Sequence, residues 1–281
     1  MAGLREGAHH VAADEAGGAG DGDVDRTGSV EGTHGAQVVA AARAGSKGLA
    51  GASARVDNGG VGERRTYGLV CALREELGSL RERARPLRRE LGHEVRELEV
   101  EGGRVLLCES GVGKVAAARG AAALLAAGVD GGILVGGTCG GLVRRLVPGT
   151  LVHCTRAVQT DLAVRAGRES QACDRLRAAW LEVAGGEQGW FLTADRPVLS
   201  LWRRIRLARA FAGPAVADME TAAVAAVADA AGVPWAALRA VTDGATGLGA
   251  VSFKLHFPSQ AGRAADTVPA LLARLGRAGP P

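Results

Sequence analysis

The chain contains few aromatic side chains: four Trp, four Phe and one Tyr make up 3% of its 281 residues. Proteins that bind single-stranded nucleic acid usually stack bases on aromatics within a basic groove. Here the net charge is only +4, and Arg side chains are scattered. The densest basic runs, 81–90 and 203–209, have the pattern of solvated helix faces. We therefore expect no nucleic-acid partner.

Long apolar runs and paired cysteines are also missing. No uncharged apolar stretch reaches the roughly 18 residues that a membrane-spanning helix needs, so we expect no membrane span. The five cysteines lie far apart without a CxxC pair, mostly within apolar strand-like runs. This pattern is typical of free buried thiols in a reducing cytosol and favours a cytoplasmic protein. The histidines lack zinc-ligand spacing, so no metal site is expected.

Neither common phosphate-binding glycine motif is present. The chain has no G-x-x-x-x-G-K-[ST] and no GxGxxG sequence. The turn at 111–114 (GVGK) comes before an Ala-rich segment and could offer backbone N–H groups to an anion. Close packing between a strand and a helix is the interpretation that we favour.

The composition divides the chain at about residue 66. Residues 1–66 are rich in Gly, Ala, Asp and Arg and have almost no large apolar side chain. Such a segment buries too little surface to offset the entropy of ordering it, so we expect a disordered tail or a start-site artefact. It also lacks the apolar core of a signal peptide. Residues 67–281 have the length of a single α/β domain.

Strand-like and helix-like segments alternate throughout residues 67–281. This order predicts a three-layer α/β/α sandwich around a central mixed sheet. The hairpin prediction centres on Gly102 and Gly103, and a helix should end at Gly128. Further strands are expected at 66–73, 149–161 and 189–194, and helices at 171–184, 199–212 and 259–276.

Acidic residues follow two buried strands of the segment VADMETAAVAAVADAAGVPWAALRAVTDGA. The first strand delivers Asp218 and Glu220, and the second delivers Asp243. The carboxyl ends of strands are where open α/β sheets bind ligands. A helix-capping role is the alternative for Glu220. Apolar neighbours would favour the protonated form of Asp243, which makes it a plausible proton donor.

Two further segments bear groups suited to catalysis. Glu75 and Glu76 follow the first strand; Glu75 has the position of a helix N-terminal charge, whereas Glu76 could serve as a general base. Residues 136–141 (GGTCGG) follow a buried strand, and glycines there permit a close backbone approach to a ligand. Thr138 is the one hydroxyl in this segment.

The motifs together resemble the nucleoside phosphorylase and nucleosidase superfamily, and are most similar to its 5'-methylthioadenosine/S-adenosylhomocysteine nucleosidases. The resemblance covers Tyr67 to about Ala273 and keeps the family's order and spacing. It rests on five motifs, CALREELGSL, SGVGKVAAA, GGTCGGL, ADMETAAVA and RAVTDGA. The family's fold agrees with the predicted sandwich.

The resemblance implies a role for each matched residue. Asp243 would protonate N7 of the purine, and Glu76 would deprotonate the attacking water, which Thr138 would help to position. Glu220 would accept hydrogen bonds from the ribose hydroxyls, above Met219. Carboxylates near the sugar suit the oxocarbenium-like transition state of N-glycosidic cleavage. No cofactor is implied.

The choice between water and phosphate as nucleophile depends on arginines. Phosphorylases of the superfamily carry an arginine where this chain has Val135, and a Gly-Asp-Pro motif with an arginine where it reads ALREE. Loss of a phosphate-binding arginine favours hydrolysis. Arg74 leaves phosphorolysis open as an alternative.

One matched segment departs from the nucleosidases. In place of their Gly-Asp-Ala-Phe-Ile, whose Phe stacks on adenine, residues 194–198 read Ala-Asp-Arg-Pro-Val, and Pro197 offers no such ring. We expect Val198 and Asp195 to contact the substrate, Asp195 at the purine edge. The spelling resembles the hopanoid-associated branch, which removes adenine from adenosylhopane; futalosine hydrolase is a further relative.

The resemblance also bears on the oligomeric state and on whether the protein is an enzyme. The resemblance implies a homodimer that pairs across the helical flank of the sheet, with a nucleoside as the small-molecule partner. A catalytically silent nucleoside-binding relative is the rival from another class, although it would have no need of Glu76 and Asp243 together.

Overall fold

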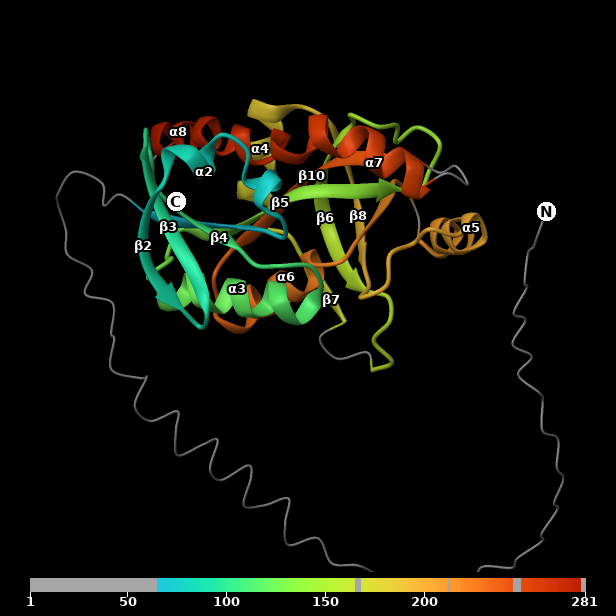
Figure 1. Ribbon diagram of the computed structural model, residues 1–281, viewed down its shortest axis with the longest axis horizontal. Coiled ribbons are helices and arrows are strands. Elements are labelled where there is room, and N and C mark those ends of the chain that lie inside the picture. Colours follow the sequence, from blue (N-terminus) through green and yellow to red (C-terminus); the bar gives the residue numbers. More distant parts are fainter. Residues whose placement is uncertain (1–64, 165–167, 212, 245–248, 279–281) are drawn as a thin grey trace, which may run out of the picture. The chain divides into compact units, whose positions relative to one another are not determined.

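The computed structural model describes residues 65–164, 168–211, 213–244 and 249–278 (Figure 1). The predicted tail, 1–66, therefore lies outside the described residues except for its last two. Thr66 is the first residue of strand β1 (Thr66–Cys71). All six residues of β1 are buried, as its apolar sequence predicts.

The described strands form one mixed sheet in the order β10-β6-β8-β9-β5-β1-β4-β3-β2, with the short strand β7 beside β6. Its members are β2 (Arg85–Glu90), β3 (His93–Val100), β4 (Gly103–Glu109), β5 (Gly132–Gly141), β6 (Leu151–Gln159), β7 (Glu169–Gln171), β8 (Glu187–Thr193), β9 (Ala215–Asp218) and β10 (Trp235–Asp243). The β3–β4 pair is the predicted hairpin, closed at Gly102.

Strand β5 is the centre of the sheet because it pairs with three others. It runs parallel to β1 and β10, and its last two residues pair antiparallel with β9. Since β10 also pairs with β6, β6 with β8 and β8 with β9, these five strands close into a ring. The ring brings the carboxyl ends of β5, β9 and β10 together.

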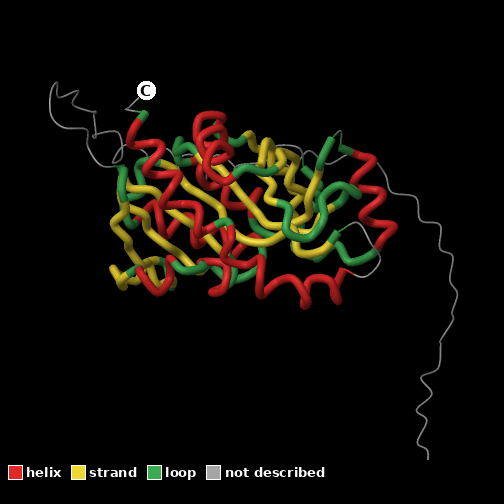
Figure 2. The backbone as a smooth tube through the Cα atoms, turned by 90° about the horizontal axis from the view of Figure 1, so that it is seen from above, coloured by secondary structure: helices red, strands yellow, loops and turns green. Residues whose placement is uncertain are grey.

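Helices cover both faces of the sheet, which confirms the predicted three-layer sandwich (Figure 1). α3 (Lys114–Ala126) and α6 (Thr221–Ala230) lie on one face, and α4 (Asp174–Ala184) and α8 (Val268–Arg277) on the other. α5 (Leu201–Ala210) and α7 (Gly249–Gln260) both lie toward the right-hand end of the domain in Figure 1, and Figure 2 shows helices at that end from above. A 3-10 turn (Arg74–Leu77) and the short α2 (Leu80–Arg83) follow β1.

Two sequence interpretations differ from the structure. The basic run at 81–90 is not one solvated helix face, because Arg85–Glu90 forms the edge strand β2. Its side chains are exposed or half-buried, so no apolar period marks it as a strand. The expected C-terminal helix at 259–276 is instead the end of α7, two 3-10 turns and α8.

The five cysteines are free thiols, and all but Cys173 are buried. Burial raises the pKa of the Cys108 thiol to about 12, so it stays protonated and unreactive at neutral pH. Among the described helices, none is long and apolar enough to cross a membrane.

Candidate active site

The acidic residues predicted from three parts of the sequence line one cavity of about 390 Å³. Glu76, Glu220 and Asp243 all contribute to its wall, at the carboxyl ends of β1, β9 and β10. Thr138, Met219 and Val198 line the same cavity.

Glu76 is the buried member of the glutamate pair and points into the cavity, whereas Glu75 is exposed. One carboxylate oxygen accepts hydrogen bonds from the backbone N–H and the hydroxyl of Thr138, both at 2.8 Å. The other accepts from the backbone N–H groups of Ala72 and Leu73, at 3.1 and 3.2 Å. These bonds fix the carboxylate next to Thr138, where the resemblance places the attacking water.

The glycines at 136–141 make room for the protein's own carboxylates. This segment continues β5 rather than forming a loop. Gly137 has φ of 142°, and a Cβ there would lie 2.8 Å from the Glu76 carboxyl. A Cβ at Gly140 would lie 3.1 Å from Oδ2 of Asp243. Larger side chains at either position would therefore displace a carboxylate of the cavity.

Glu220 receives a backbone N–H from the glycine turn at 111–114. The N–H of Gly113 donates to Oε1 of Glu220 at 3.0 Å, and Nη2 of Arg239 donates to Oε2 at 3.0 Å. The turn at 111–114 therefore binds the carboxylate of Glu220. The Glu220 side chain makes no helix-capping hydrogen bond, so the capping alternative is wrong. Burial raises the pKa of Glu220, although the charge of Arg239 opposes this shift.

Arg239 lies on buried strand β10 beneath the cavity and was not predicted from the sequence. It pairs with Asp218 and Glu220, each at 3.0 Å, and donates to the Thr138 carbonyl oxygen at 2.8 Å. Burial works against its charge, but the two carboxylates outweigh burial and raise the pKa of Arg239. An arginine within an otherwise apolar strand is a signal in itself, because such a charge requires buried partners.

Asp243 has a cationic partner, which corrects the expectation that its neighbours are apolar. Nη2 of Arg204 contacts Oδ2 of Asp243, and the Thr242 hydroxyl donates to Oδ1 at 3.1 Å. Arg204 comes from α5 and is 2% exposed. It lies within the basic run 203–209, which was interpreted as solvent-facing.

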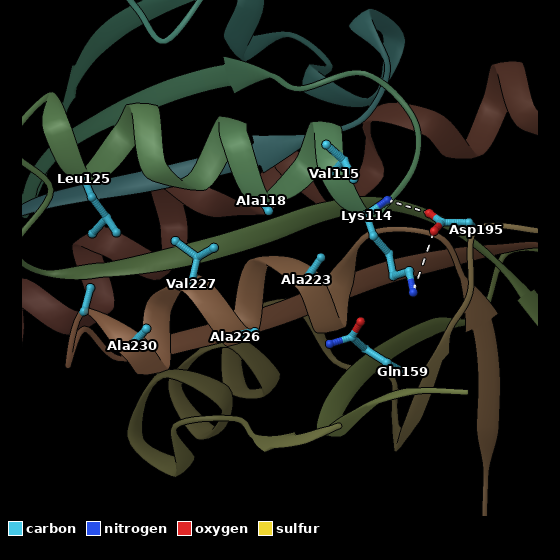
Figure 3. A pocket seen from close by; sticks show the side chains of 11 residues that line it. Lys114, Val115, Ala118, Leu125, Gln159, Asp195, Ala223, Ala226, Val227 and Ala230 are labelled. Carbon is cyan, nitrogen blue, oxygen red and sulfur yellow. Dashed lines mark hydrogen bonds and ion pairs between the residues drawn. The ribbon is translucent and has the colours of Figure 1, made fainter. Parts of the chain in front are cut away.

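Asp195 is the one predicted site residue that the structure does not bring to the cavity. It lines a separate groove between α3 and α6 (Figure 3). There it accepts from the backbone N–H of Lys114 at 2.9 Å, and Nζ of Lys114 lies 3.7 Å away. Nζ of Lys114 also pairs with Asp161 at 2.7 Å.

The α3–α6 groove has a volume of about 720 Å³ and mainly small apolar walls. Figure 3 shows alanine and valine side chains from both helices along it, with Lys114, Gln159 and Asp195 at one end. Val115, one of its lining residues, is 80% exposed. The groove thus combines small side chains with unusual apolar exposure.

Apolar residues surround the outer part of the cavity. Val112, Pro197, Leu199 and Phe253 line it and are all exposed, beside the exposed Lys254. The acids therefore lie at the inner end and an apolar rim at the outer end. Among the described residues, no three His, Cys, Asp or Glu side chains are arranged to hold a metal ion.

The arginines that line the cavity are already paired with carboxylates. Arg204 contacts Asp243, and Arg239 contacts Asp218 and Glu220. Arg74 is exposed and is not among the residues that line the cavity, and Val135 is buried in the core.

Comparison with known proteins identifies the family of this chain. A family model described as the phosphorylase superfamily matches residues 66–275. The 5'-methylthioadenosine/S-adenosylhomocysteine nucleosidase of Actinobacillus succinogenes is 30% identical over 195 residues, which cover 64% of this chain and 85% of that protein.

Solved structures show the same fold. The nucleosidase of the same name from Neisseria meningitidis, in complex with methylthio-immucillin-A, gives a TM-score of 0.69 at 26% identity, covering 74% of this chain and 99% of the other. Futalosine hydrolase of Helicobacter pylori gives 0.69 at 24% identity, covering 74% and 97%. The chain belongs to the phosphorylase superfamily.

Proposed function

We propose that the protein hydrolyses the N-glycosidic bond of an adenine nucleoside of the 5'-methylthioadenosine/S-adenosylhomocysteine type and releases adenine. The observation that carries the proposal is the meeting of Glu76, Glu220 and Asp243 in one cavity. Family membership and the activity named for the relatives support it.

Each group has a defined part in the reaction. Water adds to C1' of the ribose while Glu76 takes its proton, and the bond from C1' to N9 breaks. Asp243 gives a proton to N7, so that the base leaves without negative charge. Glu220 accepts hydrogen bonds from the ribose hydroxyls, and Met219 lies along the sugar. The carboxylates also stabilise the positive charge that develops on the ribose.

Water is favoured over phosphate because of how the cationic groups are paired. A phosphorylase must hold an anion near C1', and both cavity arginines already contact carboxylates. Lys254 is the remaining cationic side chain among the described residues that line the cavity, and it lies at the exposed rim. Four hydrogen bonds hold the Glu76 carboxyl group beside Thr138, in position to activate water.

The apolar rim supports an apolar substituent on the 5' carbon of the ribose. Val112, Leu199 and Phe253 would contact such a group once the base is near Asp243. A methylthio or alkylthio group fits this chemistry. Futalosine and adenosylhopane are the alternative substrates, and a catalytically silent binder is the alternative from another class.

The α3–α6 groove supports the expected homodimer. Its walls are small and apolar, and Val115 is 80% exposed, as in surfaces that bury against a second subunit. We place the enzyme in the cytoplasm, in keeping with its free cysteines.

The test is release of the free base, measured side by side with and without phosphate. The base is adenine from 5'-methylthioadenosine, adenosylhomocysteine and adenosylhopane, and hypoxanthine from futalosine. We expect adenine and the free sugar from 5'-methylthioadenosine without phosphate. A strict phosphate requirement would establish a phosphorylase, and release from no nucleoside would establish a binding protein.

A further inference from the structure

Arg204 is held in place by three backbone carbonyl groups as well as by Asp243. Its Nε donates to the Val198 carbonyl oxygen at 2.8 Å, and Nη1 donates to the carbonyl oxygens of Gly141, at 3.3 Å, and Gly244. Gly141 is the last residue of β5, whereas Val198 and Gly244 come after β8 and β10, so the acceptors belong to three different strand ends. The guanidinium is therefore fixed, and its remaining nitrogen points to Oδ2 of Asp243.

This arrangement leaves the two oxygens of Asp243 in different surroundings. Oδ2 contacts the guanidinium, and Oδ1 accepts only the Thr242 hydroxyl bond among the contacts of the described residues. Both side chains are buried, at 2% exposure for Arg204 and 9% for Asp243. A buried ion pair costs desolvation, so its position against the proposed acid calls for a chemical reason.

We propose that Arg204 is a positioning residue for the leaving-group proton: it fixes Asp243 through Oδ2 and stabilises the carboxylate that forms when Asp243 protonates the purine. This inference rests on the proposed function. It assigns to α5 a part in the reaction that none of the matched sequence motifs contains.

The proton transfer explains the value of a fixed cation at this point. The O–H bond of protonated Asp243 breaks, the N7–H bond forms, and the electron pair of the C1'–N9 bond moves onto the base. Asp243 then carries a full negative charge in a site shielded from water. A guanidinium already oriented by three carbonyl groups meets that charge without rearranging, which lowers the barrier. After the base leaves, the Asp243 carboxylate takes up a proton from solvent before the next turnover, and Arg204 keeps the side chain in position.

A double-mutant cycle with Arg204→Met and Asp243→Asn tests the inference in the full-length chain. We expect Arg204→Met to lower kcat for 5'-methylthioadenosine by about 10- to 100-fold with KM changed less than about threefold. In the Asp243→Asn background the same change should cost nothing further, because the group through which Arg204 acts is gone.

A substrate whose leaving group needs no proton provides the second readout. p-Nitrophenyl 5-methylthio-β-ribofuranoside releases nitrophenolate, which departs as a stable anion. Arg204→Met should cleave it within about threefold of the wild-type rate. Arg206→Met, an exposed arginine of the same helix, is the matched control and should behave as wild type on both substrates.

Several results would overturn the inference. These are an equal loss in the wild-type and Asp243→Asn backgrounds, an effect on KM alone, or an equal loss on both substrates. Thermal melts verify folding; should Arg204→Met not fold, Arg204→Lys replaces it in the cycle and should retain more activity than Arg204→Gln. A wild-type protein that releases no adenine refutes the proposed function, whereas an active wild type with additive variants refutes only the role of Arg204.

Discussion

The cavity and the α3–α6 groove differ in nearly every property, yet one turn of the chain serves both. The cavity is smaller and holds buried carboxylates and arginines, whereas the groove is nearly twice as large and has small apolar walls. At the turn, the N–H of Gly113 binds Glu220 of the cavity, and the next N–H, of Lys114, binds Asp195 of the groove.

On our proposals, the cavity carries out catalysis and the groove binds a second subunit. Volume alone would select the groove as a binding site. The groups able to transfer protons lie instead in the cavity, each held by several hydrogen bonds or an ion pair. A site for catalysis is therefore better identified by converging charged groups than by size.

Replacing Asp243 gives the largest expected effect. Asp243→Asn retains the shape of the cavity but removes the proton donor, so turnover should fall by about 10²- to 10⁴-fold. Nucleoside binding should remain measurable by calorimetry, while adenine release is followed by chromatography. Full activity in this variant would remove Asp243 from its role and leave the cavity no better supported as the catalytic site than the groove.

A methyl group at Gly137 should have the next largest effect. Its Cβ would lie 2.8 Å from the Glu76 carboxyl, so Gly137→Ala must displace that group, and we expect kcat to fall by about 10²-fold. Gly128→Ala is the matched control, since Gly128 also has positive φ, 99°, but has nothing within 4 Å. The control should lose stability and retain kcat; equal losses of kcat in both variants would contradict this account.

The pH dependence of substrate binding should reveal Glu220. Its carboxylate accepts from the ribose hydroxyls, and burial raises its pKa above the usual value for glutamate. KM should therefore rise as the pH falls, by up to about tenfold per unit, and from a higher pH than an ordinary glutamate would cause. Glu220→Gln should show a high KM without this acid limb. An unchanged limb in the variant would assign the titration to another group.

A charge in the groove should change assembly more than chemistry. Ala226→Glu places a carboxylate on the apolar wall of α6 and should shift the protein to monomers in analytical ultracentrifugation. Ala210→Glu, at an exposed position of α5, serves as the control. A dimer that survives Ala226→Glu would show that the groove is not the interface.

Removing the low-complexity segment should have the smallest effect. Deletion of residues 1–60 should leave melting temperature, KM and kcat unchanged, because that composition offers little apolar surface to bury. A lower melting temperature or a changed kcat would show that the segment contributes to one of the two regions.

The inner part of the cavity was predictable because strand ends meet at one edge of a sheet. Asp243 and Glu220 follow apolar strands, and that pattern alone brings them together. The closure of five strands into a ring was not predictable, because β5 pairs with three partners and each pairing depends on tertiary contacts.

Arg204 and Asp195 show where local patterns mislead. Four arginines at 203–209 suggest a solvated face, yet Arg204 is buried and shares a helical stripe with Leu207, Ala208 and Phe211, which pack against the core. The position of an arginine within this apolar stripe could have indicated from the sequence that Arg204 is buried. Asp195 follows a strand just as Asp243 does, and only the position of the Lys114 N–H shows which side it faces.

The edge strand β2 has a consequence for how copies of this chain can meet. Arg85, Pro86, Arg88 and Arg89 place repelling charges and a residue without an N–H along the outermost strand. Such an edge resists pairing with a strand of another molecule, and at the far side of the sheet five strands pair with one another in a ring. Growth by adding strand to strand is thereby discouraged, and helical surfaces are left as the route by which two molecules associate.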